Sequence, residues 1–193
     1  MKKILLVSIM LLQSNIVFAS DNSHMHMSEN QVMEHSQKHL KGVPNEIKNY
    51  FKGSDVDLVH RFLTQNQMKD IEKYSGVKPE NYFHTFIAIS DKNGKKSQLG
   101  AGTLVKVKDK KDIEIGLIYD NKLNIKDIIP IKNSNDLKIF LNQFKGKNHD
   151  SKFTIGKDLK YSGKETKLAQ KIAKAIQVDS LTIQELWGKA HSH

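Results

Sequence analysis

Residues 82–108, YFHTFIAISDKNGKKSQLGAGTLVKVK, decide the fold of this chain. The first nine of them are rich in aromatic and β-branched side chains, which favour a strand. Asn93-Gly94 is the dipeptide that a two-residue hairpin turn prefers. Ser97 to Lys108 then returns as a second strand. The stretch therefore predicts a β-hairpin and, with it, an antiparallel sheet.

The next segment, residues 112–131, extends this sheet. Apolar residues stand at alternate positions from Ile113 to Tyr119, as in a strand that buries one face. A polar turn at 120–122 separates them from a second run that begins at Leu123. We therefore expect a second hairpin and four consecutive antiparallel strands.

Two helices are predicted before the strands. Residues 28–31, Ser-Glu-Asn-Gln, fit a capping box that would start a short helix running to about residue 40. Thr64 and Gln67 form the same signal for a helix over 64–75, and Gly76 follows its end.

Three more helices are predicted after the strands. Ser134 is expected to cap a helix that runs to Phe144. The segment after Gly163 carries an apolar stripe of Leu168, Ile172 and Ile176. Thr182 and Glu185 form a capping box for a separate, last short helix.

This order of elements predicts an α+β fold, in which an antiparallel sheet of about four or more strands packs against helices. We divide the chain into a signal peptide at 1–19, an arm rich in methionine and histidine at 20–45, an α+β domain at 46–178, and a C-terminal helix and tail at 179–193.

The N-terminus indicates export. MKKILLVSIMLLQSNIVFAS has two lysines, an apolar run too short to span a bilayer comfortably, and a small-residue cleavage site ending at Ala19. The chain has no cysteine, so it has neither a disulfide framework nor a lipid-attachment cysteine. We expect a periplasmic protein that does not span the membrane after cleavage of the signal peptide.

The net charge of +10 comes almost entirely from lysine, and Arg61 is the single arginine. Nucleic-acid binding would favour clustered basic residues with arginine forks and interleaved aromatic residues, so we do not expect it. The excess charge favours a solvated surface, an acidic partner or an anionic ligand.

Four stretches resemble the FMN-binding domain family of exported bacterial flavoproteins: FLTQNQMKDIEKYSGVK at 62–78, FHTFIAISDKNGKKSQLGAG at 83–102, FLNQFKG at 140–146 and FTIGKDLKYSG at 153–163. The resemblance runs from Phe62 to about Ile176. It implies an FMN-binding-domain-like fold and a redox or electron-transfer role with a periplasmic or membrane redox partner.

The resemblance also implies a flavin site. Family members carry Ser-Gly-Ala-Thr at a turn against which FMN lies, in some joined to the threonine through its phosphate. Here the turn is Ser162-Gly163-Lys164-Glu165, and a carboxylate at the threonine position excludes the phosphothreonine-type ester. FMN would therefore be non-covalent. Thr166 offers a hydroxyl, but a shift of one residue turns the side chain by roughly 100° around a helix.

Two interpretations of this turn remain open. Ser162 and Glu165 also fit a capping box, whose side chains would use the N–H groups that a phosphate needs. Lys157, Lys160 and Lys164 would instead attract an anion. The resemblance places Gly100 and Gly102 near the flavin ring, although glycine in a strand is equally typical of an ordinary bulge.

The arm suggests a different function. Residues 24–39 contain the imidazoles and thioethers that copper prefers, with thioether favouring Cu(I). The candidate ligands are His24, Met25, His26, Met27, Met33, His35 and His39. The alternatives are a periplasmic copper protein that has lost flavin, or a plain polar arm. His60, His84 and His149 are single histidines, more typical of a surface or a satisfied core than of a metal site.

The sequence shows no nucleophile–base–acid arrangement, no H-E-x-x-H and no phosphate-binding loop. Whether the protein is an enzyme stays open, and any chemistry would be the redox chemistry of a flavin.

Overall fold

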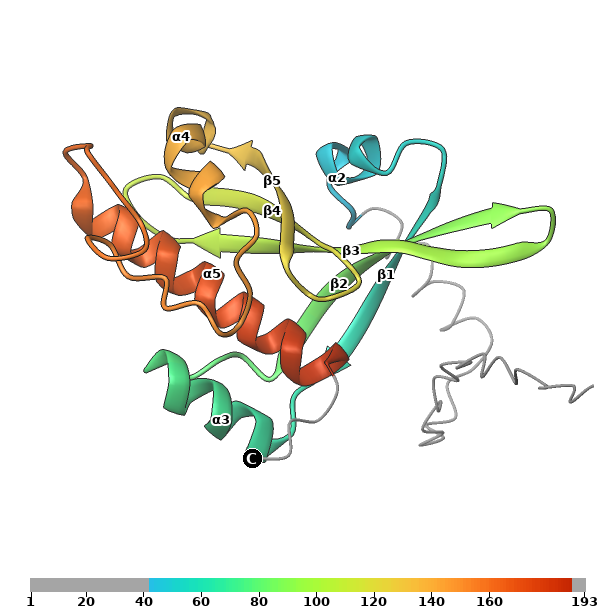
Figure 1. Ribbon diagram of the computed structural model, residues 1–193, viewed down its shortest axis with the longest axis horizontal. Coiled ribbons are helices and arrows are strands. Elements are labelled where there is room, and N and C mark those ends of the chain that lie inside the picture. The colour runs from blue at the N-terminus through green and yellow to red at the C-terminus, as the bar shows by residue number, and fades with distance from the viewer. Residues whose placement is uncertain (1–41, 189–193) are drawn as a thin grey trace, which may run out of the picture.

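The computed structural model describes residues 42–188 (Figure 1). The expected signal peptide, the helix expected at 28–40, most of the arm with its candidate metal ligands, and residues 189–193 lie outside the described residues. Among the helices of residues 42–188, none is both long and apolar enough to cross a membrane.

The centre of the molecule is one antiparallel sheet of five strands in the order β1-β2-β3-β4-β5. The strands are β1 (Asp55–Phe62), β2 (Tyr82–Lys92), β3 (Lys95–Val107), β4 (Ile113–Tyr119) and β5 (Ile125–Lys132). The predicted α+β class is confirmed, and so are the four consecutive strands β2 to β5. Strand β1, in which charged and apolar residues alternate, was not predicted.

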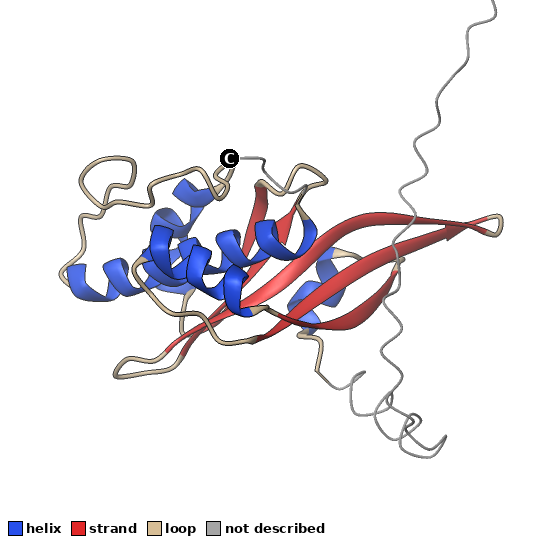
Figure 2. Ribbon diagram, turned by 90° about the horizontal axis from the view of Figure 1, so that it is seen from below, coloured by secondary structure: helices blue, strands red, loops and turns tan. Residues whose placement is uncertain are grey.

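The β2–β3 hairpin turns at the predicted dipeptide. Asn93 and Gly94 have φ values of 57° and 76°, and a two-residue type I′ turn requires positive φ at both of these positions. The side chain of Asp91 accepts a hydrogen bond of 3.0 Å from the N–H of Gly94. The hairpin extends beyond the rest of the sheet (Figures 1 and 2).

Helices cover both faces of the sheet. They are α2 (Asn45–Tyr50), α3 (Gln65–Ser75), α4 (Lys138–Leu141) between the short 3-10 helices η1 (Asn135–Leu137) and η2 (Asn142–Phe144), and α5 (Thr166–Trp187). Leu117 and Tyr119 of β4 face the core under α5, whereas Ile118 between them packs with α2. Helix α3 packs against α5 in a third, smaller cluster.

The predicted helix α3 is confirmed in detail. Thr64 and Gln67 form the capping box, and Gly76 ends the helix with a positive φ of 70°.

Two other helix predictions are wrong in part. Ser134 does not cap its segment, because its hydroxyl bonds to Ile131 and Glu114 instead, and the segment contains only one turn of α-helix.

The separate last helix is also wrong, because α5 continues without interruption to Trp187. The hydroxyl of Thr182 donates to the carbonyl of Val178, four residues earlier in the same helix, at 2.8 Å. The residue with a capping signal is therefore in the middle of a helix, where its hydroxyl is satisfied by the preceding turn. The boundary drawn at residue 178 falls inside α5.

A substitution in α2 tests the packing on the face of the sheet that α2 covers. Ile47 is fully buried, and it contacts the positions where β-carbons of Gly102 and Gly116 would lie, at 3.6 and 3.4 Å. We expect Ile47→Ala to lower the free energy of unfolding by about 2–5 kcal/mol, the cost of a large-to-small change in a core. Urea denaturation measures this.

The matched control is Ile139→Ala, because Ile139 is 87% exposed. Its expected effect is within about 0.5 kcal/mol. Equal losses in the two variants would contradict the role of α2 in the core.

Candidate functional site

The sheet splits between β2 and β3, and a groove occupies the split. Their pairing runs from the hairpin as far as Phe86 and Gly102. Beyond this point, among the described strands, β2 pairs with β1 and β3 pairs with β4, but β2 and β3 no longer pair with each other. Figure 1 shows the two strand pairs separating, with α5 crossing the open side. The groove has a volume of about 940 Å³, which is within the usual range of small-molecule sites.

The walls of the groove are mostly apolar, and its edge is basic. Apolar side chains come from both diverging strands and from α5; they include Phe83, Phe86, Leu104, Val105, Ala175 and Val178. Five lysines line it as well, Lys78, Lys106, Lys108, Lys171 and Lys174, against two carboxylates, Glu80 and Asp179. The groove therefore favours an apolar ligand that carries negative charge.

Two of the lysines are already held by the protein. Lys174 donates to the carbonyl of Ser75 at 2.7 Å and to the side chain of Gln177 at 2.9 Å. Lys171 pairs with Asp109 at 2.7 Å. Lys106 and Lys108 are exposed at the end of β3 and its loop, so their ammonium groups can turn toward a ligand in the groove.

A buried carboxylate lies where α5 meets the split. Asp179 is 5% exposed, and its Oδ1 accepts hydrogen bonds of 2.7 Å from the hydroxyls of Thr103 and Tyr119. Burial raises the pKa of Asp179 to about 6, although the two hydroxyl donors oppose the shift. Burial and the charge of Asp179 also raise the pKa of Tyr119 well above its ordinary value.

Thr85 adds an unsatisfied hydroxyl to this region. Strands β2 and β3 part after Phe86 and Gly102, so Thr85 and Thr103 are the first residues on the separated strands. Thr85 is fully buried, and its Oγ1 has no hydrogen-bond partner within the described part of the chain. A buried hydroxyl without a partner costs stability, and such groups are uncommon.

The groove was not predicted, but one signal for it was present. Asp179 continues the buried stripe of α5, three residues after Ile176 and four before Ile183. A carboxylate at a core position of an amphipathic helix indicates a buried polar contact. Its partners, Thr103 and Tyr119, lie 76 and 60 residues away in the sequence, and no local pattern connects them.

Glu165, the last residue of the predicted turn, lines a second, smaller cleft of about 500 Å³. Three segments meet there: the β3–β4 loop, the β5–η1 connection, and the start of α5 with Glu165 and Leu168. Its charged residues are two lysines, Lys110 and Lys111, and three carboxylates, Asp109, Asp136 and Glu165. The balance is slightly negative, unlike that of the groove.

The turn does not form the predicted capping box. Helix α5 begins at Thr166, and Glu165 is its N-cap residue without a side-chain hydrogen bond to the backbone. The Glu165 carboxylate lies 3.9 Å from the ammonium of Lys110 instead, in an exposed ion pair. The candidate residues Ser162, Gly163, Lys164 and Thr166 are all exposed.

Gly100 and Gly102 lie on the other face of the sheet, against α2. A β-carbon on Gly100 would approach the ring of Phe51 to 3.3 Å, and one on Gly102 would approach Ile118 to 3.3 Å. The register shifts beside Gly100, as expected for a bulge. The start of α5 lies beside the loop that follows β3. Gly100 is seven residues before the end of β3, about 23 Å away from that loop at the rise of a strand. The structure therefore does not bring these glycines together with the Ser162 turn.

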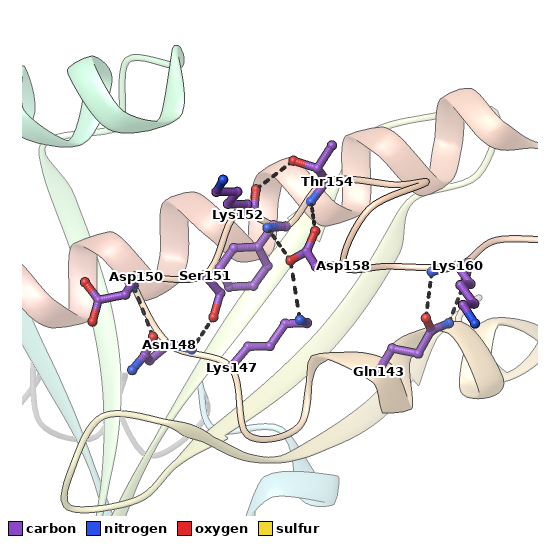
Figure 3. Close-up of polar contacts among 10 residues, drawn as sticks. Gln143, Lys147, Asn148, Asp150, Ser151, Lys152, Thr154, Asp158 and Lys160 are labelled. Atoms are coloured by element: carbon purple, nitrogen blue, oxygen red, sulfur yellow. Dashed lines mark hydrogen bonds and ion pairs between the residues drawn. The ribbon is translucent and has the colours of Figure 1, made fainter.

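The irregular segment before the turn is held by a network of polar contacts (Figure 3). The carboxylate of Asp158 accepts the N–H groups of Phe153 and Thr154 at 2.9 and 2.6 Å and the ammonium of Lys147 at 3.4 Å. Burial alone would raise the pKa of Asp158, but these donors outweigh it and lower the pKa. Gln143 exchanges two hydrogen bonds of 2.7 Å with the backbone of Lys160, which fixes the approach to the turn.

Comparison with known proteins identifies no relative of this chain. No family model matches the chain, and no curated protein or solved structure matches it.

The buried carboxylate makes stability depend on pH. Because the pKa of Asp179 rises from 3.8 to about 6 on folding, the folded state binds the proton more tightly. The free energy of unfolding is therefore highest below pH 3.8 for this group and falls as the pH rises through 6. At about 1.4 kcal/mol for each pKa unit, the full effect is about 3 kcal/mol.

Asp179→Asn removes this titration but keeps an oxygen that can accept from Thr103 and Tyr119. We expect the stability of the variant relative to the wild type to improve by about 2–3 kcal/mol between pH 4 and pH 7.5. Chemical denaturation of both proteins at the two pH values measures the difference. A difference that does not change with pH would contradict the prediction.

Proposed function

We propose that the chain is an exported FMN-binding-like protein with a redox or electron-transfer accessory role, and that a flavin mononucleotide lies in the groove between β2 and β3. One observation carries the proposal. The groove combines apolar walls with an excess of lysine over carboxylate, and this combination matches a ligand with an apolar ring system and a phosphate.

The residues of the groove fit both ends of such a ligand. Lys106 and Lys108 would bind the phosphate, since both are exposed at one rim. Phe83, Val105 and Val178 offer apolar surface to the ring system. Bound FMN would supply one- and two-electron redox chemistry, while the protein holds the ring and modulates its electronic environment.

The Ser162 turn supports this function less well. Within the described residues no side-chain cap hydrogen bond is made at the start of α5, which leaves its first N–H groups as candidate donors to an anion. Its cleft, however, has three carboxylates against two lysines, and like charges disfavour a phosphate. The turn is therefore the alternative location for the same ligand, and it is the location that the resemblance to flavoproteins implies.

Copper binding by the Met/His-rich arm stays the alternative function, as a periplasmic metal-binding protein. Its ligands, from His24 to His39, lie outside the described residues. Residues 42–188 contain no group of three or more metal-ligating side chains of histidine, aspartate or glutamate. Titration of the full-length mature chain with Cu(I), against a variant lacking residues 20–42, tests this alternative. Equal affinity would remove it.

The flavin proposal is tested by titrating the mature chain with FMN and following the quenching of flavin fluorescence. We expect Lys106→Glu to weaken FMN binding at least about tenfold, because it places a carboxylate next to the phosphate. The matched control is Lys111→Glu, an equal charge reversal on an exposed lysine of the smaller cleft. It should change the affinity by less than about twofold.

Riboflavin, which lacks the phosphate, separates the two ends of the ligand. It should bind more weakly than FMN and should not discriminate between Lys106→Glu and the wild type. A loss that follows Lys111→Glu alone would move the site to the Ser162 turn. Absence of flavin binding by the folded wild-type chain would contradict the function itself.

A further inference from the structure

The groove has two polar ends, and they lie far apart along β3. Helix α5 runs beside this strand, because Asp179 accepts a hydrogen bond from Thr103 and Lys171 pairs with Asp109, just past the end of the strand. Lys106, at the rim of the groove, follows Thr103 by three residues, about 10 Å at the rise of a strand. The carboxyl group of Asp179 therefore lies at the inner end, where the sheet splits, and the exposed lysines lie at the outer end.

Only one oxygen of Asp179 is used by the protein. Oδ1 accepts the hydroxyls of Thr103 and Tyr119, both at 2.7 Å. Oδ2 accepts no hydrogen bond from residues 42–188. It is also not among their fully buried polar atoms that lack a partner, and Asp179 lines the groove. Oδ2 is therefore the oxygen that a ligand in the groove can reach.

No ammonium group in the described part of the chain forms an ion pair with Asp179. The nearest lysine along the same helix wall, Lys174, donates to the carbonyl of Ser75 and to Gln177. Burial already raises the pKa of Asp179 to about 6. A ligand that covers Oδ2 removes its remaining contact with solvent, which disfavours the charged form further. The protonated carboxyl group is therefore the form that a ligand selects.

We propose that Asp179 is a specificity-determining residue of the groove, which as a neutral carboxylic acid donates a hydrogen bond from Oδ2 to a carbonyl oxygen of the ligand ring, so that binding takes up a proton from solution. This inference rests on the proposed function, because the ring system of FMN carries such carbonyl groups. It also sets the direction of the ligand, with the ring at the split and the phosphate at the rim.

Other titratable groups must be separated from Asp179. Tyr119 touches the carboxyl group directly, but burial and the charge of Asp179 raise its pKa well above the ordinary value, so it stays neutral. From β2 and the segment before it, the groove is lined by Lys78, Glu80, Tyr82 and His84. From β3 and its loop it is lined by Lys106 and Lys108, and from α5 by Lys171 and Lys174.

Among these residue types, histidine is the one that ordinarily titrates between pH 5 and 8. His84 shares a face of the sheet with Phe86, which packs with α2, whereas Asp179 lies on the α5 side. A variant of Asp179 therefore distinguishes the two groups.

The test is isothermal titration calorimetry of the full-length mature chain with riboflavin and with FMN. Measurements in two buffers with different heats of ionisation count the protons taken up. Riboflavin is the decisive probe, because the phosphate of FMN itself titrates near pH 6. We expect uptake of about one half to one proton per riboflavin at pH 7, and an affinity roughly tenfold lower at pH 8 than at pH 6.5.

Asp179→Asn places an amide N–H group where the acid carries its proton, while its oxygen can still accept from Thr103 and Tyr119. We expect no proton uptake and an affinity for riboflavin that changes by less than about twofold from pH 6.5 to pH 8. At pH 8 the variant should bind riboflavin at least about fivefold more tightly than the wild type. Asp136→Asn, at an exposed carboxylate of the smaller cleft, is the matched control and should behave as the wild type.

Riboflavin binding by the wild type without proton uptake would overturn this inference and leave the proposed function in place, even if the variant failed to fold. Uptake that persists in Asp179→Asn would also overturn it and would point to His84. Binding of FMN without measurable binding of riboflavin would contradict the contact with the ring. If the folded wild type bound neither flavin, the proposed function and this inference would both be wrong.

Discussion

The hydrogen bonds from Thr103 and Tyr119 to the buried carboxylate of Asp179 join α5 to the sheet at the place where β2 and β3 separate. A carboxylate in a core is costly unless it is hydrogen-bonded, so this contact fixes both the position and the rotation of the helix. Ile176 and Ile183, on either side of Asp179, are fully buried as a result. Because this contact holds α5 across the space between β2 and β3, residues of α5 form one wall of the groove.

Local signals were sufficient for most of the fold. The Asn93-Gly94 turn, the capping box at Thr64 and the alternation along β4 all describe contacts within a few residues, and each predicted its element. Errors arose where a local signal competed with a distant partner. Ser134 has the side chain of a helix cap, but its hydroxyl bonds to the carbonyl of Glu114, twenty residues away. Thr182 has the same signal and lies inside a continuous helix, because the buried face of α5 extends past it.

The candidate groove could be predicted less well than the fold, for a geometric reason. Its buried polar contacts join α5 to residues 76 and 60 positions earlier in the chain, so local spacing carries little information about them. Gly100 illustrates the opposite case: the resemblance placed it near a ligand, whereas in the structure the space above it is filled by Phe51, which follows α2. Helix α2 was itself not predicted, because six residues provide too short a pattern.

Within residues 42–188, strand β1 is an outer strand of the sheet and pairs with β2 on one side. The outer backbone of such a strand is a template on which a second chain can add a strand. Asp55, Asp57 and Arg61 place charges along this edge, and another strand would have to strip water from them. At the opposite edge, Pro130 of β5 lacks an N–H group to donate. Both borders of the sheet therefore resist the edge-to-edge addition of a strand from another chain.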